Sequence, residues 1–168
     1  MVQADIVASR DRLDSGELRK AFGCFATGVT IVTAYDADGR PRGMTANSFT
    51  SVSLDPPLIL VCVATAAPIW SVLAEAPGFA VNVLSEHQQD ISQRFATPVP
   101  DKFAGTAWRE PAMPGGPILA DVAAHLVCRR ERHVEVGDHM LLIGEVLDFA
   151  RSPSRPLIFH QGAYRAVA

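Results

Sequence analysis

Apolar and polar residues follow a helical period in only three short segments of this 168-residue chain, and the first lies near its N-terminus. Asp14 with Glu17 three residues later forms a capping box, a pattern that satisfies the free N–H groups at the start of a helix. Gly28 is expected to end this helix. Its apolar residues recur at helical spacing and are expected to bury one face: Leu18, Ala21, Phe22 and Phe25.

The other two predicted helices are short, and each follows a start signal. Residues 69–73 come directly after Pro68, and proline is favoured in the first turn of a helix. Ser85 and Gln88 repeat the capping-box spacing, and two apolar residues four positions apart give the helix that follows an apolar edge.

Strands are predicted for most of the remaining chain, because apolar and β-branched runs are separated there by short turn sequences. The runs cover residues 29–35, 58–64, 79–84, 123–135, 140–149, 157–160 and 163–167, and another strand begins near Arg42. The turn sequence Asp-Ala-Asp-Gly at residues 36–39 makes a hairpin of the first run and the strand at Arg42. Neighbouring strands joined by short turns predict a mainly β fold, an antiparallel barrel with a few short helices.

A chain of 168 residues and 18.0 kDa has the size of one domain. Residues 1–13 lack apolar periodicity and are expected to form a flexible N-terminal arm, which leaves residues 14–168 as the folded domain. Residues 96–117 contain five prolines and Trp108, and an irregular stretch of this length is usually functional or packed over another part of the domain.

The charge balance and the hydropathy exclude several classes of partner. The net charge is −3, from 15 basic and 18 acidic residues, so the basic excess of a nucleic-acid-binding protein is absent, and an acidic membrane surface is an equally poor partner. The uncharged run at residues 56–74 is interrupted by three prolines and does not predict a membrane span. The mean hydropathy of +0.15 is high for a small domain and indicates apolar surface that a partner subunit covers.

The cysteines and the N-terminal residues indicate the cellular compartment in which the protein is expected. Cys24, Cys62 and Cys128 form no Cys-x-x-Cys pair, and they are expected to be small buried residues in a reducing environment. The N-terminal residues include no apolar segment of the kind found in signal peptides, so a cytoplasmic location is expected.

Several familiar motifs are missing from the sequence. It contains neither the G-x-x-x-x-G-K-[ST] phosphate loop nor the G-x-G-x-x-G dinucleotide turn, and it has no G-x-S-x-G nucleophile elbow. The five histidines have none of the spacings of a metal site, so no metal ion is expected.

Residues 43–53, Gly-Met-Thr-Ala-Asn-Ser-Phe-Thr-Ser-Val-Ser, stand out because six of the eleven carry a short hydroxyl or amide side chain and none is charged. On one strand, alternate members of this segment would share a face: Thr45, Asn47, Phe49, Ser51 and Ser53. Short polar side chains let a planar ligand approach the backbone, whose N–H and C=O groups then bind its edge. A strand with a solvated face is the alternative, and composition alone favours it.

This segment also carries a family resemblance. Residues 43–49 and 51–58 resemble the signature of the short-chain flavin reductases with the FMN-binding split-barrel fold, which include the reductase components of two-component flavin-dependent monooxygenases. The likeness continues at Phe22 and at residues 26–29, 81–84, 94–96, 101–103, 137–139 and 162–164, and it covers nearly the whole chain from about Leu18. It implies an antiparallel split β-barrel of Greek-key type with a few short helices.

The resemblance implies a flavin site assembled from several segments. The edge of the flavin ring would be lined by Thr45, Ala46, Asn47 and Ser48, with Ser51 and Ser53 nearby. The ribityl and phosphate side would be held by Val63, Ala64 and Thr65, and the phosphate pocket would be completed by Arg94 and Phe95. Phe103 and Tyr164 would wall the nicotinamide or the flavin.

Three of these assignments have an alternative, and one segment departs from the pattern of the family. An ordinary exposed helix arginine is the alternative for Arg94, and core packing is the alternative for Phe103 and Tyr164. Relatives often carry hydroxyl residues where this chain has Ala66, Ala67 and Pro68.

His139, in the turn Gly137-Asp138-His139, is the candidate catalytic residue. In the family that the chain resembles, the histidine of this turn lies beside the nicotinamide ring. Its role would be to position that ring, because hydride transfer from nicotinamide C4 to flavin N5 needs no protein nucleophile. A hairpin residue without a function is the alternative for a lone histidine.

The resemblance therefore implies an enzyme, an NAD(P)H-dependent flavin reductase that transfers hydride from NADH or NADPH to FMN or FAD. It also implies a homodimer with the flavin at the subunit boundary, and reduced flavin that feeds a separate monooxygenase. Two alternatives stay open: a flavin-retaining oxidase or electron carrier, and a non-catalytic flavin- or haem-binding split-barrel protein. The residues do not distinguish FMN from FAD or NADH from NADPH.

Overall fold

The structure is a computed structural model that describes residues 13–166, so the flexible arm predicted for residues 1–13 lies outside the described residues apart from Leu13. The helices are α2 (Ser15–Gly23), α3 (Trp70–Glu75) and α4 (Gln89–Ala96). The strands are β1 (Thr27–Gly28), β2 (Thr30–Tyr35), β3 (Pro41–Ala46), β4 (Thr50–Leu54), β5 (Pro57–Ala64), β6 (Gly78–Val83), β7 (Trp108–Arg109), β8 (Ile118–Leu119), β9 (Ala124–Val136), β10 (His139–Arg151), β11 (Ile158–His160) and β12 (Ala163–Arg165).

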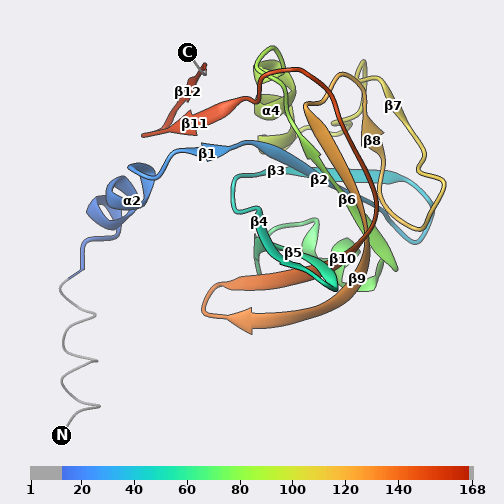
Figure 1. The fold of residues 1–168 in the computed structure, drawn as a ribbon. Coiled ribbons are helices and arrows are strands. Elements are labelled where there is room, and N and C mark those ends of the chain that lie inside the picture. The colour runs from blue at the N-terminus through green and yellow to red at the C-terminus, as the bar shows by residue number, and fades with distance from the viewer. Residues whose placement is uncertain (1–12, 167–168) are drawn as a thin grey trace, which may run out of the picture.

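Seven strands form one antiparallel sheet in the order β3-β2-β6-β9-β10-β5-β4, which confirms the mainly β prediction (Figure 1). Its two edge strands, β3 and β4, are neighbours in the chain and are joined only by residues 47–49. A linker of this length cannot cross a flat sheet of that width, because neighbouring strands lie about 4.8 Å apart. The sheet therefore curls until its two edges meet.

The two edges meet at a seam that a serine side chain closes. Ser48, in the linker between β3 and β4, donates its hydroxyl to the carbonyl of Cys62 at 2.9 Å and accepts the Cys62 N–H at 3.0 Å. Cys62 lies on β5, and the register that pairs Thr50 with Leu60 places Ser48 opposite it, so the serine side chain continues the β4–β5 ladder beyond the end of β4. The barrel stays split along this seam.

Two apolar clusters fill the barrel and its cap. The larger cluster lies between the strands of the main sheet and α3, and it includes the fully buried residues Val61, Phe79 and Leu142. The smaller cluster joins β2, α4 and the long loop after α4, and it includes Phe95, Phe103 and Leu119. Phe103 of the loop is part of the smaller cluster, so the irregular segment predicted at residues 96–117 packs against the barrel.

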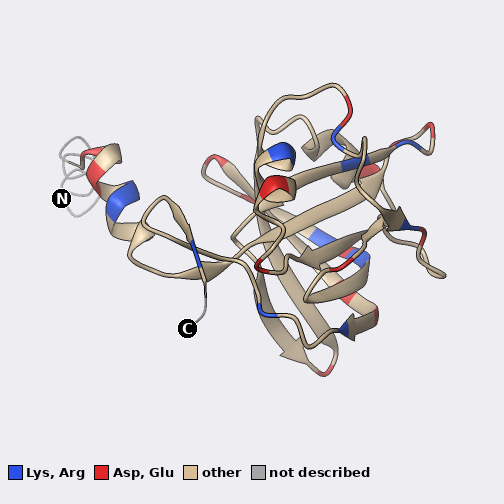
Figure 2. Cartoon of the chain, turned by 90° about the horizontal axis from the view of Figure 1, so that it is seen from above, with Lys and Arg blue, Asp and Glu red and all other residues tan. Residues whose placement is uncertain are grey.

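A helix and a small sheet project from the barrel. Strands β1, β11 and β12 form a three-stranded sheet, and Figures 1 and 2 both show this sheet and α2 extending away from the main sheet. Of the predicted capping box only the N-cap half forms: the Asp14 carboxylate accepts the Glu17 N–H at 2.8 Å, whereas the Glu17 carboxylate pairs with Lys20 at 2.7 Å. We call α2 together with this small sheet the projecting arm.

Two expectations for the first helix are wrong. It ends at Gly23, not Gly28, because residues 27–28 leave the helix and pair with β11 as β1. It also buries no residue within one chain, and the side chains of Phe22 and Phe25 are 70% and 78% exposed. The apolar face is therefore present, but no part of residues 13–166 covers it.

Three further expectations need correction. Residues 43–53 are not one strand, because the chain leaves one sheet edge after Ala46 and joins the other at Thr50. The third helix begins at Gln89, and only the reverse half of the predicted capping box forms: the Ser85 N–H donates to Gln88 Oε1 at 3.0 Å. Cys24 is exposed, whereas Cys62 is half-buried and Cys128 is buried.

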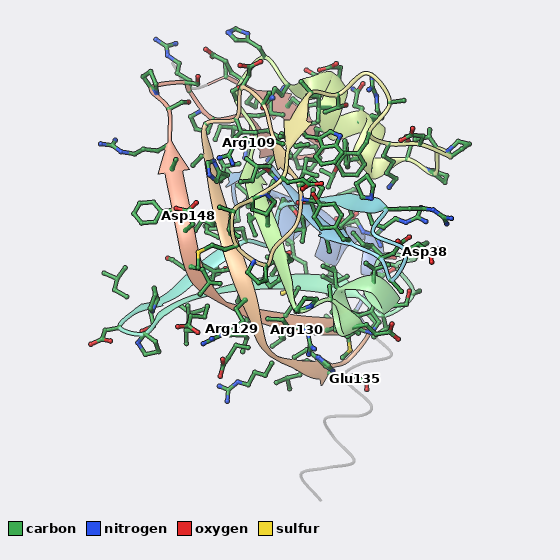
Figure 3. All side chains as sticks on the ribbon, turned by 90° about the vertical axis from the view of Figure 1, so that its right-hand side faces the viewer. Asp38, Arg109, Arg129, Arg130, Glu135 and Asp148 are labelled. Atoms are coloured by element: carbon green, nitrogen blue, oxygen red, sulfur yellow. The ribbon has the colours of Figure 1, made fainter. Side chains whose placement is uncertain are left out.

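The positions of charged residues are dispersed along the ribbon in the view of Figure 2. On β9, Arg129 forms an ion pair with Glu145, and Arg130 Nε donates to the carbonyl of Ala76 at 2.9 Å; Figure 3 labels both arginines. Among residues 13–166, no helix has both the length and the apolar composition that crossing a membrane requires.

Candidate functional site

The linker at the seam, residues 47–49, has backbone N–H and C=O groups that are not used in the sheet. Strand β3 ends at Ala46 and β4 begins at Thr50, so the peptide groups of Asn47, Ser48 and Phe49 lie outside both ladders. Within the described part of the chain, these peptide groups make no backbone hydrogen bond. Backbone N–H and C=O groups need a partner, so a ligand or water must satisfy them here.

The other predicted site residues between positions 46 and 53 differ in how far they are buried. Ala46 is buried, and its carbonyl accepts the Thr30 hydroxyl at 2.8 Å. Asn47 and Ser51 are exposed, and Ser53 is half-buried. The edge that faces outward at the seam is therefore Asn47 and the peptide groups beside it.

Hydroxyl groups connect β3 to α4 and to the small sheet of the projecting arm. Thr45 donates its hydroxyl to the carbonyl of Ser92 at 2.7 Å, and the Ser92 hydroxyl lies 2.8 Å from that of Tyr164. Phe159 packs against Tyr164 with ring centroids 5.4 Å apart. The structure thus brings Thr45 and Tyr164 together through Ser92, which the sequence reasoning did not identify.

On the other side of the seam, the predicted phosphate-side residues meet the histidine turn. Ala64 and His139 are opposite each other in the β5–β10 ladder, two residues beyond the contact between Cys62 and the seam. Thr65 donates both its N–H (3.0 Å) and its hydroxyl (3.1 Å) to the carbonyl of Asp138. His139 therefore lies about 7 Å along β5 from the seam, at roughly 3.3 Å per residue.

The imidazole of His139 is oriented by its neighbour in the turn. Its Nδ1 lies 2.6 Å from Oδ1 of Asp138, and its side chain is 46% exposed. This hydrogen bond, together with the charge of the imidazole, holds the pKa of Asp138 below its usual value. The contact fixes the ring through Nδ1, so Nε2 is the ring nitrogen that remains for a ligand.

A groove of about 1160 Å³ opens beside β3. Its walls are β3, the segment of residues 67–72 that begins α3, and the loop of residues 96–104 that follows α4. Trp108 and the predicted site residues Thr45, Phe95 and Phe103 also line it. Thr45 is the last residue of β3 that lines the groove, and residues 46–49 at the seam are not part of its lining.

The wall of the groove is built from packed aromatic rings. Phe95 and Phe103 meet edge to face with centroids 5.0 Å apart, and they are only 1% and 7% exposed. Gly43 permits this packing, because a Cβ there would lie 2.6 Å from Cε1 of Phe95. Phe95 and Phe103 are therefore packed as core residues, which for Phe103 is the alternative that the sequence left open.

Two predicted contacts are placed elsewhere. Arg94 does not line the groove; its Nη1 donates to the carbonyl of Ala104 at 2.5 Å and to the Thr106 hydroxyl at 3.1 Å, so that the arginine fastens the loop. Val63 is fully buried in the larger cluster, because alternate residues of β5 point into the barrel, and its side chain faces no open site.

Two residues of the groove carry functional potential that the sequence reasoning missed. Lys102 is half-buried, and its Nζ donates to the carbonyl of Phe95 at 2.7 Å. Trp108 is 36% exposed, although its ring packs edge to face on Phe103 at 5.9 Å. The sequence Asp101-Lys102-Phe103 was part of the family resemblance and could have pointed to Lys102; Trp108 had no such signal.

Comparison with known proteins matches residues 22–168 to the family model described as the flavin reductase like domain. The chain is 42% identical, over 170 residues covering 98% of it and 91% of the relative, to an NADH-dependent FAD reductase of Streptomyces globisporus. It is 52% identical over 151 residues, 90% of the chain, to a probable flavin reductase of Rhizobium meliloti. The chain spans only 48% of the length of that second relative.

Solved structures give the same result. The NADH:FAD oxidoreductase SgcE6 of Streptomyces globisporus C-1027, in complex with NAD and FAD fragments, superposes with a TM-score of 0.88 at 43% identity, covering 92% of this chain and 93% of that one. The flavin reductase PheA2 in its native state superposes with a TM-score of 0.84 at 38% identity, covering 93% and 99% of the two chains. The fold and the motif resemblance predicted from the sequence are both confirmed, and the chain belongs to the family of proteins with a flavin reductase like domain.

Proposed function

We propose that the protein is an NAD(P)H:flavin oxidoreductase that reduces FMN or FAD and supplies the reduced flavin to a separate monooxygenase. The observation that carries the proposal is the seam: three consecutive peptide groups, at residues 47–49, lie outside the sheet ladders within reach of the turn that holds His139. A flavin ring presents alternating hydrogen-bond donors and acceptors along one edge, and an uncovered backbone segment offers the complementary set.

The residues present fit a flavin and a nicotinamide. The flavin accepts a hydride from the nicotinamide when both are bound, so the chain has to hold and orient two planar ligands. Asn47 and the peptide groups at the seam bind the ring edge, and the short side chains of Ser51 and Ser53 leave room for its approach. His139, fixed through Nδ1 by Asp138, positions the nicotinamide from the rim.

The relatives support this assignment in their own names. Besides the FAD reductase of Streptomyces globisporus, they include the reductase component of a flavin-dependent trigonelline monooxygenase of Acinetobacter baylyi, 45% identical over 88% of this chain. Another is the reductase subunit HsaB of a flavin-dependent monooxygenase of Rhodococcus jostii, 38% identical over 99% of this chain and 85% of the relative. A separate oxygenase partner follows from this pattern.

A homodimer accounts for the projecting arm. An exposed apolar patch marks an interface; here the side chains of Phe22 and Phe25 on the arm and Leu54 on β4 are 70%, 78% and 94% exposed. A second copy related by a two-fold axis would receive the arm on its barrel and return its own, covering these side chains on both chains. The cytoplasm fits such an enzyme, since Cys24, Cys62 and Cys128 are free thiols and a reducing compartment keeps thiols unpaired.

The test follows nicotinamide absorbance at 340 nm while purified protein is mixed with NADH or NADPH and with excess FMN or FAD. Oxidation that depends on added flavin is expected. The absence of oxidation with every pairing would refute the reductase assignment, and oxidation without added flavin in a yellow protein would identify the flavin-retaining alternative.

The histidine is tested in the same assay. His139→Ala should raise the KM for the nicotinamide about tenfold or more while flavin binding stays near the unchanged level, since positioning effects of this kind are commonly of that size or larger. His87→Ala is the control, because the His87 side chain is 88% exposed and its one ion pair among residues 13–166 is with Glu86 at 3.6 Å. Equal loss of flavin and nicotinamide binding would assign His139 a structural role.

A further inference from the structure

A cavity of about 510 Å³ lies apart from the seam and from the groove beside β3. It opens between the β7–β8 pair and the place where β9 begins and β10 ends. Of the described residues, only Trp108 lines both this cavity and the groove. The volume falls within the range of roughly 300–1,000 Å³ that is usual for sites of small ligands.

Hydrogen bonds hold the frame of this cavity on both sides. The N–H of Ala120 donates to the carbonyl of Ala107 at 2.9 Å, which joins the two segments of the β7–β8 pair where the chain turns toward β9. Ser152, after β10, donates its N–H to the carbonyl of Ala123 at 2.8 Å and its hydroxyl to the carbonyl of Val122 at 3.0 Å. The cavity is therefore preformed, as sites of small ligands usually are.

One wall of the cavity is apolar. Ile118, Leu119 and Val122 line it and are buried. The ring of Trp108 adds a flat surface, and Phe103 holds that ring edge to face at 5.9 Å between centroids. Such a wall favours a ligand with an apolar body, because burying apolar surface contributes about 25 cal/mol per Å².

A polar side chain is buried in the same lining without a partner. His125 lies on β9 opposite Ala150 of β10, and it is only 8% exposed. Within residues 13–166, its imidazole makes no hydrogen bond and no ion pair. Buried polar groups in proteins are normally hydrogen-bonded, so the imidazole is available to a molecule in the cavity.

The charged residues of the lining are also uncompensated. Arg109 and Arg151 stand against one carboxylate, that of Asp121, so two positive charges and one negative charge give the lining a formal charge of +1 with a neutral imidazole. None of these three side chains forms an ion pair in the part of the chain that the structure describes. The cavity therefore has a positive charge that a single anion would neutralise.

The pKa of His125 responds to the charges around the cavity. Burial lowers it most, the guanidinium of Arg109 lowers it further, and Asp148 on β10 opposes them with the smallest effect; Figure 3 labels Arg109 and Asp148. A negative charge in the cavity would favour the protonated imidazole and counteract the first two effects.

We propose that this cavity binds a small organic carboxylate with an apolar body, such as an aromatic acid, as a ligand distinct from the flavin and the nicotinamide. The carboxylate accepts hydrogen bonds from His125 and Arg109, with Arg151 as the second positive charge, and the apolar body lies against the wall that Leu119 and Trp108 form. A monoanion with an apolar body suits a lining of charge +1 better than a phosphate does. The site uses neither cofactor, so it goes beyond the proposed function and does not rest on it.

Benzoate is the probe for the first experiment. Its binding to the full-length protein is measured by calorimetry and by tryptophan fluorescence, because Trp108 lines the cavity. Benzoate should bind at least about tenfold more tightly than acetate, which lacks the apolar body, and than benzamide, which lacks the charge. Benzamide or inorganic phosphate binding as tightly as benzoate would refute the proposal, and so would the absence of saturable benzoate binding.

Arginine variants locate the bound probe. Arg109→Gln should weaken benzoate binding about fivefold to tenfold, since a hydrogen bond to a charged group contributes roughly 1.5 kcal/mol or more. Arg109 is exposed, so its replacement leaves the core intact. Arg19→Gln is the matched control, because Arg19 is exposed on α2 in the projecting arm, and its affinity should stay within about twofold. Equal affinities of the two variants would overturn the assignment.

The pH profile tests the histidine. A bound carboxylate raises the pKa of His125, so binding takes up a proton and the affinity for benzoate should rise as the pH falls from 8 to 6, where a carboxyl group with a pKa near 4 stays ionised. His125→Gln should remove this rise, whereas His87→Gln, at a histidine whose side chain is 88% exposed, should keep it. A rise that persists in His125→Gln would exclude the imidazole as a partner and refute the proposal.

Competition separates the cavity from the cofactor site. Saturating FMN, FAD or NADH should leave benzoate bound, with an affinity within about threefold of its value in their absence. Displacement of benzoate by any of them would place the probe in the cofactor site and refute the proposal. The titration needs no turnover, so failure of the reductase assignment has a different signature, namely benzoate binding without oxidation of NADH or NADPH.

Discussion

Replacing Ser48 by alanine tests the closure of the barrel. The hydroxyl makes two hydrogen bonds to Cys62, as donor at 2.9 Å and as acceptor at 3.0 Å. Each such bond contributes about 0.5–1.5 kcal/mol net, and a polar group left without its partner costs about 1–3 kcal/mol. The variant should therefore be less stable by roughly 2 kcal/mol, with the seam as the place where the sheet opens.

Urea denaturation followed by circular dichroism measures this change at a fixed protein concentration. With a slope of roughly 2 kcal/mol/M, the midpoint should fall by about 1 M, and the slope itself should stay the same. Ser51→Ala is the matched control, because Ser51 is exposed and its hydroxyl makes no hydrogen bond among the described residues; its midpoint should move by no more than about 0.3 M, the shift of a surface substitution. Equal midpoints for the two variants would refute the claim that Ser48 closes the barrel.

Three further changes test other parts of the structure. Gly43→Ala should lower the free energy of unfolding by about 1–3 kcal/mol, since its Cβ would lie 2.6 Å from Cε1 of Phe95, whereas Gly28→Ala, with no atom within 4 Å, should leave the melting temperature nearly unchanged. Burial lowers the pKa of His125 from 6.5, so the unfolded chain binds more protons as the pH falls below that value and stability is lost there; His125→Gln should flatten the decline between pH 7 and pH 5 in urea titrations, and an unaltered slope would contradict this. Arg94→Met releases the loop that follows α4, and limited proteolysis should cut that loop faster while the barrel strands resist as before.

The strands were predictable because their signal is local. Apolar and β-branched runs bounded by turn sequences predicted every strand of the main sheet except β4, and the turn predicted between residues 135 and 140 lies between β9 and β10. The break at residues 47–49 was not predictable in this way. The chain breaks here because it passes from one edge of the sheet to the other. The residue pattern of a single segment contains no information about where those two edges lie.

In the candidate site, too, some features could be predicted from local sequence and others depend on tertiary contacts. The segment of residues 43–53 and the turn at His139 were identified from their motifs, but the link from Thr45 to Tyr164 passes through Ser92, a residue far from both in the chain. Arg94 was assigned to a phosphate because a guanidinium suits an anion, whereas the structure directs it to the loop. Side-chain direction and pairing depend on tertiary contacts, and residue type alone does not supply them.

The position of β4 at one end of the sheet has a consequence for handling the protein. It pairs with β5 on one side only, and it carries Leu54 and Val52 with exposed fractions of 94% and 52%. An apolar edge strand with free backbone groups is a template for pairing with other chains. If the proposed homodimer forms, dilution or mild acid that separates the two copies should therefore lead to aggregation and not to a stable monomer, and Leu54→Lys should suppress that aggregation.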